Sequence, residues 1–259
     1  MTTGLRIRRA VGACAVSLVA LATAAGAGTS KSPPSTTSGN WSGYAVSGHG
    51  RTFTDVTGSW TQPAVACRDG SSSSSSFWVG LGGFAPTATG VEQVGTSADC
   101  ESGEPVYYAW YELAPQPAVV VKLDVAPGDR LAAEVSVTGK AATVWLIDVT
   151  QGGAFATTRH VDEPDLSSAE WIAEAPSACA ASCRVLPLAN FGATKFTATS
   201  VTSGSHTGTI TDAAWSASSI ELTTRRPDLA GASPSHLSTD GSSFTVATGH
   251  PRKRGHRHR

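Results

Sequence analysis

The chain consists of many short runs in which apolar and polar residues alternate, and no other feature limits its fold as strongly. Alternation with a period of two is typical of β-strands that bury one face, whereas long amphipathic helical patterns are rare in this sequence. Gly and Pro separate the runs, as at Pro127-Gly128-Asp129 and Gly152-Gly153. Strands are expected at 43–47, 52–61, 74–81, 90–96, 106–113, 118–125, 130–137, 142–149, 154–161, 169–174, 191–201, 208–211 and 217–223. Short strands at this spacing predict an all-β sandwich or barrel.

The amino terminus has the three parts of a secretory signal peptide. Arg6, Arg8 and Arg9 form a basic region, an apolar stretch follows at 11–25, and small residues at 22–27 fit a cleavage site. A membrane anchor is the alternative, but the apolar stretch is short and rich in Ala and Gly. We therefore expect residues 1–27 to be removed on export. The mature protein should be secreted and extracellular, with no membrane attachment after cleavage.

Composition divides the remaining residues into three parts. Residues 28–39 are rich in Ser, Thr and Pro and predict a flexible leader. The strand pattern fills 40–224, which is a reasonable length for one all-β domain. Residues 225–259 are rich in Pro, Ser, Gly and Arg, and predict a flexible basic tail. Such a tail could bind nucleic acid or an anionic surface, although a solvated tail without a dedicated partner is favoured.

The charge of the central region differs from that of the whole chain. The complete sequence has a formal net charge of −1, but between Gly28 and Thr224 there are 18 acidic and 9 basic residues, a net charge of −9. An acidic, Lys-poor domain argues against nucleic acid as its substrate. At low pH its carboxylates would become neutral, and few basic groups would remain to repel one another. This balance suits a secreted protein that works in acid.

Four cysteines remain after the signal peptide, an even number in an oxidising compartment. Three pairings are possible. We favour Cys67–Cys100 and Cys179–Cys183 because each pair is nearest in sequence, which does not decide the matter. A metal site is the less favoured alternative because no His lies near these cysteines at ligand spacing. We expect no metal and no other cofactor.

The run 168–176 combines an apolar face with two carboxylates. Because successive side chains of a strand point to opposite faces, Trp171 lies on one face, whereas Glu170, Ile172 and Glu174 share the other. The run is consistent with a sheet that has one solvated face, and also with a strand that lines a groove. Aromatic residues beside polar groups, such as Trp110, suit a groove for an extended polysaccharide or polypeptide, with core packing as the alternative.

Four stretches together resemble the glutamic peptidases, or eqolisins, known as secreted acid proteases of fungi. They are 76–83 (SFWVGLGG), 92–96 (EQVGT), 107–112 (YYAWYE) and 169–174 (AEWIAE). The resemblance covers about 40–222. It implies a sandwich of two antiparallel sheets, similar to concanavalin and other lectins, with a substrate groove on the concave face. It also implies catalytic roles for Gln93 and Glu174, and it places Trp78, Trp110 and Glu112 in the groove as substrate-binding residues.

The sequence departs from the fungal pattern at two positions. The fungal enzymes carry an Asp where this chain has Gly82, and another where it has Tyr108. Both changes remove a carboxylate from near the expected site. They bear on the pH optimum and on substrate preference more than on the chemistry. The leader before Asn40 is also much shorter than the long propeptide of the fungal precursors.

A Gln and a Glu can together hydrolyse a peptide bond. An ionised Glu174 can take a proton from water and later return it to the leaving nitrogen. Gln93 can donate an amide N–H to the oxyanion and accept a hydrogen bond from the water. An ordinary Glu has a pKa of about 4.3, so the base would stay partly ionised in mild acid.

The expected function is therefore a secreted acid endopeptidase that acts as a monomer on polypeptide substrates. Two other functions remain open. One is a lectin-like polysaccharide-binding protein, because similar sandwiches bind sugars. The other is a glycosidase that uses a carboxylate pair such as Glu112 and Glu174. Gln93 distinguishes the peptidase from the glycosidase, since a carboxylate pair has no fixed need for a Gln.

Overall fold

The computed structural model describes residues 32–85, 88, 90–179, 183–224 and 230–249, in which every regular element is a β-strand. The strands are β1 (Ser35–Ser38), β2 (Trp41–Ser47), β3 (Phe53–Thr61), β4 (Ser76–Leu81), β5 (Glu92–Glu101), β6 (Glu104–Leu113), β7 (Val119–Val121), β8 (Arg130–Thr138), β9 (Ala141–Asp148), β10 (Gly153–His160), β11 (Ser168–Glu174), β12 (Ser177–Cys179), β13 (Cys183–Val185), β14 (Ala193–Ser203), β15 (His206–Gly208), β16 (Ser216–Leu222), β17 (Ala232–Pro234) and β18 (Phe244–Thr248). The predicted all-β class is confirmed. Within these residues there is accordingly no helix of the length and apolarity needed to cross a membrane.

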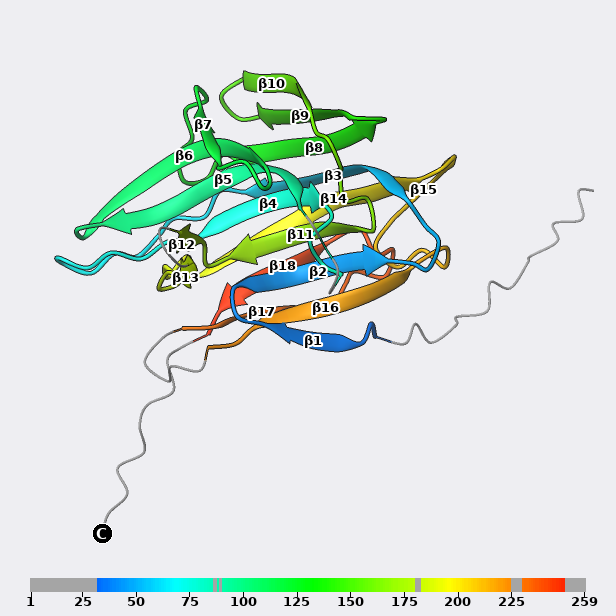
Figure 1. Ribbon diagram of the computed structural model, residues 1–259. Helices are drawn as coiled ribbons and strands as arrows, with labels where there is room; N and C mark the ends of the chain where they lie inside the picture. The colour runs from blue at the N-terminus through cyan, green and yellow to red at the C-terminus, as the bar shows by residue number, and fades with distance from the viewer. Residues whose placement is uncertain (1–31, 86–87, 89, 180–182, 225–229, 250–259) are drawn as a thin grey trace, which may run out of the picture. The chain divides into compact units, whose positions relative to one another are not determined.

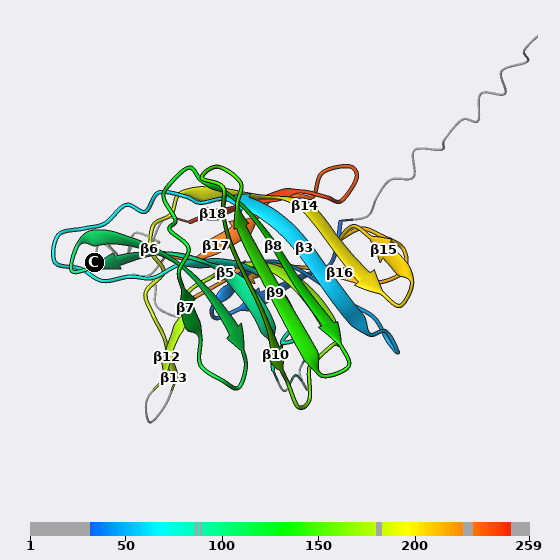
Figure 2. The same ribbon diagram turned by 90° about the horizontal axis from the view of Figure 1, so that it is seen from above.

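The strands are arranged in two packed layers. One layer has the order β7-β6-β5-β4-β11-β2-β16, and the other has the order β10-β9-β8-β3-β14-β18-β17. The short β17 pairs with both β16 and β18 and so joins the two layers into one hydrogen-bonded path. Except for β1, which runs parallel to β16, the strand pairings are antiparallel. Figure 1 shows the strand order, and Figure 2 shows β3, β8, β9 and β10 lying over the other layer. The predicted antiparallel sandwich is confirmed.

The core between the layers is built from the alternating apolar residues. Trp171 on β11 is fully buried, and its indole Nε1 donates a hydrogen bond to the carbonyl oxygen of Thr57 on β3 at 2.7 Å. Gly58 allows this close approach, because a Cβ atom at this position would lie 2.8 Å from the Trp171 ring. Phe77 packs edge-on against Phe191 with the ring centroids 5.0 Å apart. The core therefore includes the face of β11 that carries Trp171, and the face that carries Glu174 is turned away from the core.

The ordered sheet extends beyond the predicted domain at both ends. Within the predicted flexible leader, Ser35–Ser38 forms β1 and pairs with β16. Within the predicted flexible tail, β17 and β18 join the second layer. Phe244 of β18 stacks on Phe196 with the ring centroids 5.1 Å apart and packs edge-on against Tyr44 at 4.7 Å. These buried aromatic contacts explain why a Ser- and Gly-rich segment is nevertheless ordered.

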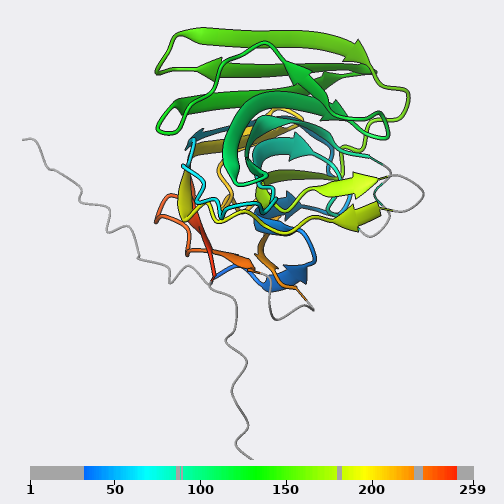
Figure 3. The same cartoon turned by 90° about the vertical axis from the view of Figure 1, so that its left-hand side faces the viewer.

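The cysteine predictions have different outcomes. Cys67 and Cys100 form a disulfide with their Cα atoms 5.5 Å apart, which confirms this predicted pair. The β12–β13 hairpin, which projects from the layers in Figure 3, places Cys179 opposite Cys183 in the strand register. The side chain of Cys179 lies outside the described residues, and the second pair therefore stays a prediction. The predicted signal peptide at 1–27 also lies outside them.

Candidate active site

The candidate site lies on the face of the first layer that is turned away from the core. Residues paired directly across neighbouring strands point to the same face, so the strand register determines which side chains meet there. Gln93 of β5 is paired with Glu112 of β6, and Glu174 of β11 is paired with Ser76 of β4. Gln93, Trp110, Glu112 and Glu174 all line one cleft of about 580 Å³. The structure thus brings together four of the five residues that the sequence singled out.

The Glu174 carboxylate is held by two hydrogen-bond donors. The side-chain amide of Asn40 donates to Oε1 at 2.9 Å, and the indole Nε1 of Trp78 donates to Oε2 at 2.8 Å. Burial raises the pKa of Glu174 to about 7, while the hydrogen bonds from Trp78 and Asn40 favour the ionised form and limit the rise. The ordinary pKa expected from sequence is therefore wrong for this residue. A carboxyl group with a pKa near 7 can exchange a proton readily in weakly acidic solution.

Gln93 and Glu112 form a close pair across β5 and β6. The Gln93 Nε2 atom donates a hydrogen bond to Oε2 of Glu112 at 2.6 Å. Burial raises the pKa of Glu112, and the hydrogen bond from Gln93 opposes that rise. The Gln93 carbonyl oxygen is buried and has no donor among the described residues. While Glu112 is ionised it can only accept hydrogen bonds, so it holds the nitrogen end of the Gln93 amide towards itself. The carbonyl oxygen is then left to receive a hydrogen bond from something else.

The two tryptophans have different positions in the site. Trp78 is fully buried and packs edge-on against Trp41 with the ring centroids 5.0 Å apart. It reaches the site through its Nε1 hydrogen bond to Glu174 and is absent from the lining of the cleft. Trp110 is 6% exposed and does line the cleft. The structure therefore places Trp78 as a support for the carboxylate and Trp110 as a wall.

Glu170 lies on the same face of β11 as Glu174 but does not reach the cleft. It is fully buried, and neither carboxyl oxygen has a well-formed hydrogen bond among the described residues. Burial raises the pKa of Glu170 well above its ordinary value, the nearby Ser168 hydroxyl offsets only part of this effect, and Asp165 and Glu92 raise the pKa further. Only one of the two carboxyl groups on this face is therefore available to a substrate.

Two features of the site were not identified in the sequence. In the sequence Asn40 marks only the start of the domain, although in the structure it supplies one of the two donors to Glu174. No motif marks it, because its role depends on the pairing of β2 with β11. Gly82, where the fungal enzymes carry an Asp, lies against Asp165, and a Cβ atom there would clash with the Asp165 carbonyl oxygen. Asp165 lies on another loop, and it thus brings a carboxylate close to the position where the fungal enzymes carry their Asp.

Among the described residues, no three His, Cys, Asp or Glu side chains converge as metal ligands would. What the cleft does contain is a carboxyl group with a raised pKa and an amide held in one orientation. These are the groups needed for proton transfer and for stabilising an oxyanion.

The chain is similar to known proteins over most of its length. The family model described as "Peptidase A4 family" matches residues 39–240. Aspergillopepsin-2 from Aspergillus niger is 31% identical over 196 residues, and the chain spans 66% of that relative's length, with 66% of the chain itself covered.

Two solved structures have the same fold. Scytalido-glutamic peptidase, solved with a peptide-based transition state analog, superposes with a TM-score of 0.67 at 22% identity, over 81% of this chain and 98% of that one. Aspergilloglutamic peptidase from Aspergillus niger gives a TM-score of 0.55 at 28% identity, over 68% of this chain and 98% of that one. The family match extends over far more than half of the sequence, and the chain therefore belongs to the Peptidase A4 family, the glutamic peptidases or eqolisins.

Proposed function

We propose that the protein is an endopeptidase in which Glu174 and Gln93 act together on a water molecule, with no metal and no covalent intermediate. The observation that carries this proposal is that both side chains line one cleft and are each fixed by a partner. Glu174 is fixed by Asn40 and Trp78, and Gln93 is fixed by Glu112. A preorganised pair of this kind costs little reorganisation when charge develops during the reaction.

Each group has a distinct task in the proposed mechanism. Ionised Glu174 accepts a proton from the attacking water, and the resulting carboxylic acid then protonates the leaving nitrogen. One N–H of the Gln93 amide is occupied by Glu112, so the second N–H is the one that donates to the oxyanion. The Gln93 carbonyl oxygen accepts a hydrogen bond from the water. One oxyanion donor is worth about 2.7–4 kcal/mol of barrier.

The pKa of Glu174 sets the acid side of the proposed pH dependence. A general base must be ionised, and with a pKa of about 7 its ionised fraction falls roughly tenfold for each pH unit below that value. The rate limited by this base should therefore increase with pH up to about 7. We propose that the enzyme reaches its full rate at a higher pH than it would with a base of ordinary Glu pKa.

The test is a set of single variants assayed on a denatured protein between pH 4 and 7. Glu174→Gln is nearly isosteric but cannot accept the proton, and a loss of about 10²–10⁴ in kcat is expected. Gln93→Ala should lose about 10²–10³ in kcat. The double variant should be little worse than either single variant, because both groups act on the same water. Near-UV circular dichroism checks that each variant is folded.

Glu170→Gln is the matched control, because Glu170 lies two residues away on the same strand face without reaching the cleft. Its activity should remain close to that of the wild type. If Glu170→Gln were inactive while Glu174→Gln kept substantial activity, the assignment of the base would be wrong. If the wild type were inert on protein but bound or cleaved polysaccharide, the lectin-like or glycosidase function would replace the peptidase.

We also propose that the protein is exported and acts as a monomer. The basic and apolar pattern at 1–27 supports export, and the Cys67–Cys100 disulfide is typical of proteins in oxidising compartments. Amino-terminal sequencing of the protein from the culture medium tests the export. A first residue before position 25 in the extracellular protein would contradict the predicted cleavage.

A further inference from the structure

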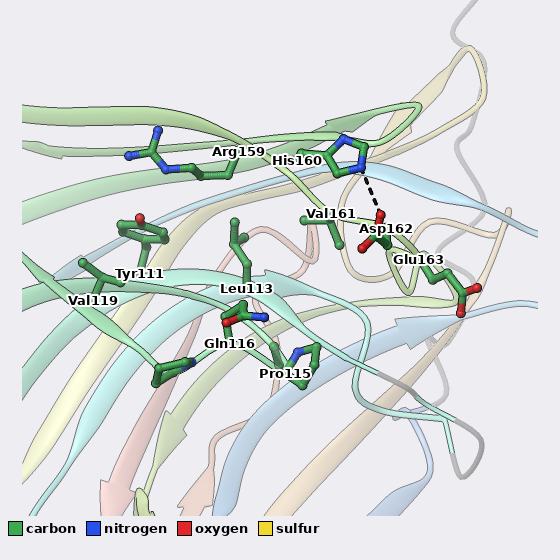
Figure 4. Close-up of a pocket in the computed structure, with 12 residues that line it drawn as sticks. Tyr111, Leu113, Pro115, Gln116, Val119, Arg159, His160, Val161, Asp162 and Glu163 are labelled. Carbon is green, nitrogen blue, oxygen red and sulfur yellow. Dashed lines mark hydrogen bonds and ion pairs between the residues drawn. The ribbon is translucent and has the colours of Figure 1, made fainter.

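A second hollow lies beside the candidate active site. It measures about 500 Å³ and lies between the end of β6 with the short β7 on one side and the end of β10 on the other. Tyr111, Leu113 and Val119 line it from the first layer, and Arg159 and Val161 line it from the opposite side, as Figure 4 shows. We call this space the β10 hollow. Its walls are largely apolar, with charged groups at the rim.

The β10 hollow and the active-site cleft lie on the two faces of the same edge strand. Val119 of β7 lines the hollow together with Tyr111, its direct partner on β6. Val120, the next residue, lines the cleft together with its own partner, Trp110. The loop between β6 and β7 also belongs to both spaces, because Pro115 and Pro117 line each of them. An extended chain beside β7 would therefore place alternate side chains in the two spaces.

The outer edge of β7 is free and unusually apolar. β7 is the last strand of its layer, and that edge pairs with no strand of the described residues. Val119 is 45% exposed and Val120 is 65% exposed. Exposed apolar edge strands promote pairing with other chains, and proteins normally protect them with Pro, charges or bulges. Here Pro117 and Lys122 flank the strand, but Val119 and Val120 remain exposed. Such an edge is suited to receive an extended polypeptide.

On the basis of the proposed function, we propose that β7 is a docking strand for the polypeptide substrate. The substrate adds to the free edge of β7 as a further strand, held by main-chain hydrogen bonds. One side chain enters the cleft that contains Glu174, and the neighbouring side chain enters the β10 hollow. The apolar walls formed by Tyr111, Leu113 and Val161 select an aliphatic or aromatic side chain at that second position.

The test compares a long and a short substrate in Val119→Asp. A reduced and alkylated protein can occupy both spaces, whereas a short fluorogenic peptide can occupy only the cleft. The variant places a charge where an apolar side chain would pack. We expect KM for the long substrate to rise about tenfold and the preference for the long substrate to be lost. Val119→Thr, which keeps the shape of the side chain, should produce a smaller rise.

Val149→Asp is the matched control, because Val149 is 51% exposed and lines neither space. It should leave KM for both substrates unchanged. Equal KM values for the long substrate in the wild type and in Val119→Asp would overturn the proposal. It would also be overturned if the wild type sedimented as a dimer and Val119→Asp as a monomer, because the edge would then pair two copies of this chain.

A binding measurement separates this proposal from the proposed function. An extended apolar peptide is titrated into Glu174→Gln and into the Glu174→Gln, Val119→Asp double variant by calorimetry. Binding that weakens about tenfold in the double variant supports the docking strand, even if the wild type hydrolyses nothing and the proposed catalysis fails. Unchanged binding overturns the docking strand, even if the wild type is an active peptidase.

Discussion

Glu92→Gln should make the protein more stable at neutral pH. Glu92 is 1% exposed and lies next to Gln93 on β5, but its side chain points to the opposite face of the strand. Its Oε2 atom has no hydrogen-bond donor among the described residues. Burial raises the pKa of Glu92 to about 8, and the charge of nearby Asp165 adds to this rise. Glutamine has almost the same shape and stays neutral at every pH.

The magnitude follows from the difference in pKa between the folded and unfolded states. Below pH 4.5 both states hold the proton, and the full stability is present. As pH rises towards 8, the unfolded chain releases the proton but the folded protein does not, so the free energy of unfolding falls. A pKa raised from 4.5 to about 8 corresponds to a loss of roughly 5 kcal/mol. For a protein of this size, that is a Tm difference of about 10–20 °C.

The assay is thermal and urea unfolding of the wild type and Glu92→Gln at pH values from 4 to 9. The wild type should lose stability steadily between about pH 5 and 8, and the variant should lose roughly 5 kcal/mol less over this range. A substantial slope should remain in the variant, because burial also raises the pKa of Asp55 to about 6, that of Glu174 to about 7, and that of Glu170 well above its ordinary value. Glu104→Gln is the control, since Glu104 is exposed at the start of β6. It should follow the wild-type curve.

Two results would contradict this reasoning. One is a wild type whose stability is constant from pH 5 to 8, which would mean that Glu92 is already ionised or exposed in the folded protein. The other is a Glu92→Gln variant that is destabilised equally at pH 4 and pH 8. In that case the side chain would contribute through specific hydrogen bonds and not through its protonation.

Three further predictions concern the site and the scaffold. Trp78→Phe removes the indole donor to Glu174, so the pKa of Glu174 should rise further and the acid limb of the kcat/KM profile should move to higher pH; an unchanged limb would count against this donor. Proteolysis should survive chelators, serine-protease inhibitors and pepstatin-type inhibitors, and complete loss of activity with a chelator would contradict the metal-free mechanism. Replacing Cys67 and Cys100 by Ser opens a cross-link with a sequence separation of 33 residues and should cost about 3–4 kcal/mol in unfolding free energy, which urea titration measures; a free thiol at either position in the wild type would refute the bond.

Strand periodicity and short motifs identify much of the site from the sequence. The alternation in β11 separates Trp171, which faces the core, from Glu174, which faces the cleft. It cannot separate Glu174 from Glu170, because both lie on one face and differ only in what covers them. The sequence does not mark Asn40, because its role depends on the pairing of strands that are more than a hundred residues apart. The raised pKa of Glu174 depends on burial, which a motif does not report.

Composition also does not reveal the ordered strands near the two ends, for a related reason. A Ser- and Gly-rich composition indicates flexibility when the segment has nothing to pack against. Phe244, however, completes an aromatic cluster with Phe196 and Tyr44. One well-placed aromatic residue is enough to order a segment whose average composition suggests disorder. Such a residue becomes visible only when the partners it meets in the fold are known.

The position of Asn40 limits how the amino terminus can be processed. Asn40 follows β1 and donates a hydrogen bond to Glu174, while its carbonyl oxygen accepts one from the backbone N–H of Ala175. A maturation protease that cut between Asn40 and Trp41 would remove one of the two donors that favour the ionised carboxylate. The shortened enzyme would then need a higher pH to ionise its base. In the proposed mechanism, an amino terminus before Asn40 and one after it would therefore give enzymes with different pH profiles, and a preparation with mixed amino termini would contain both.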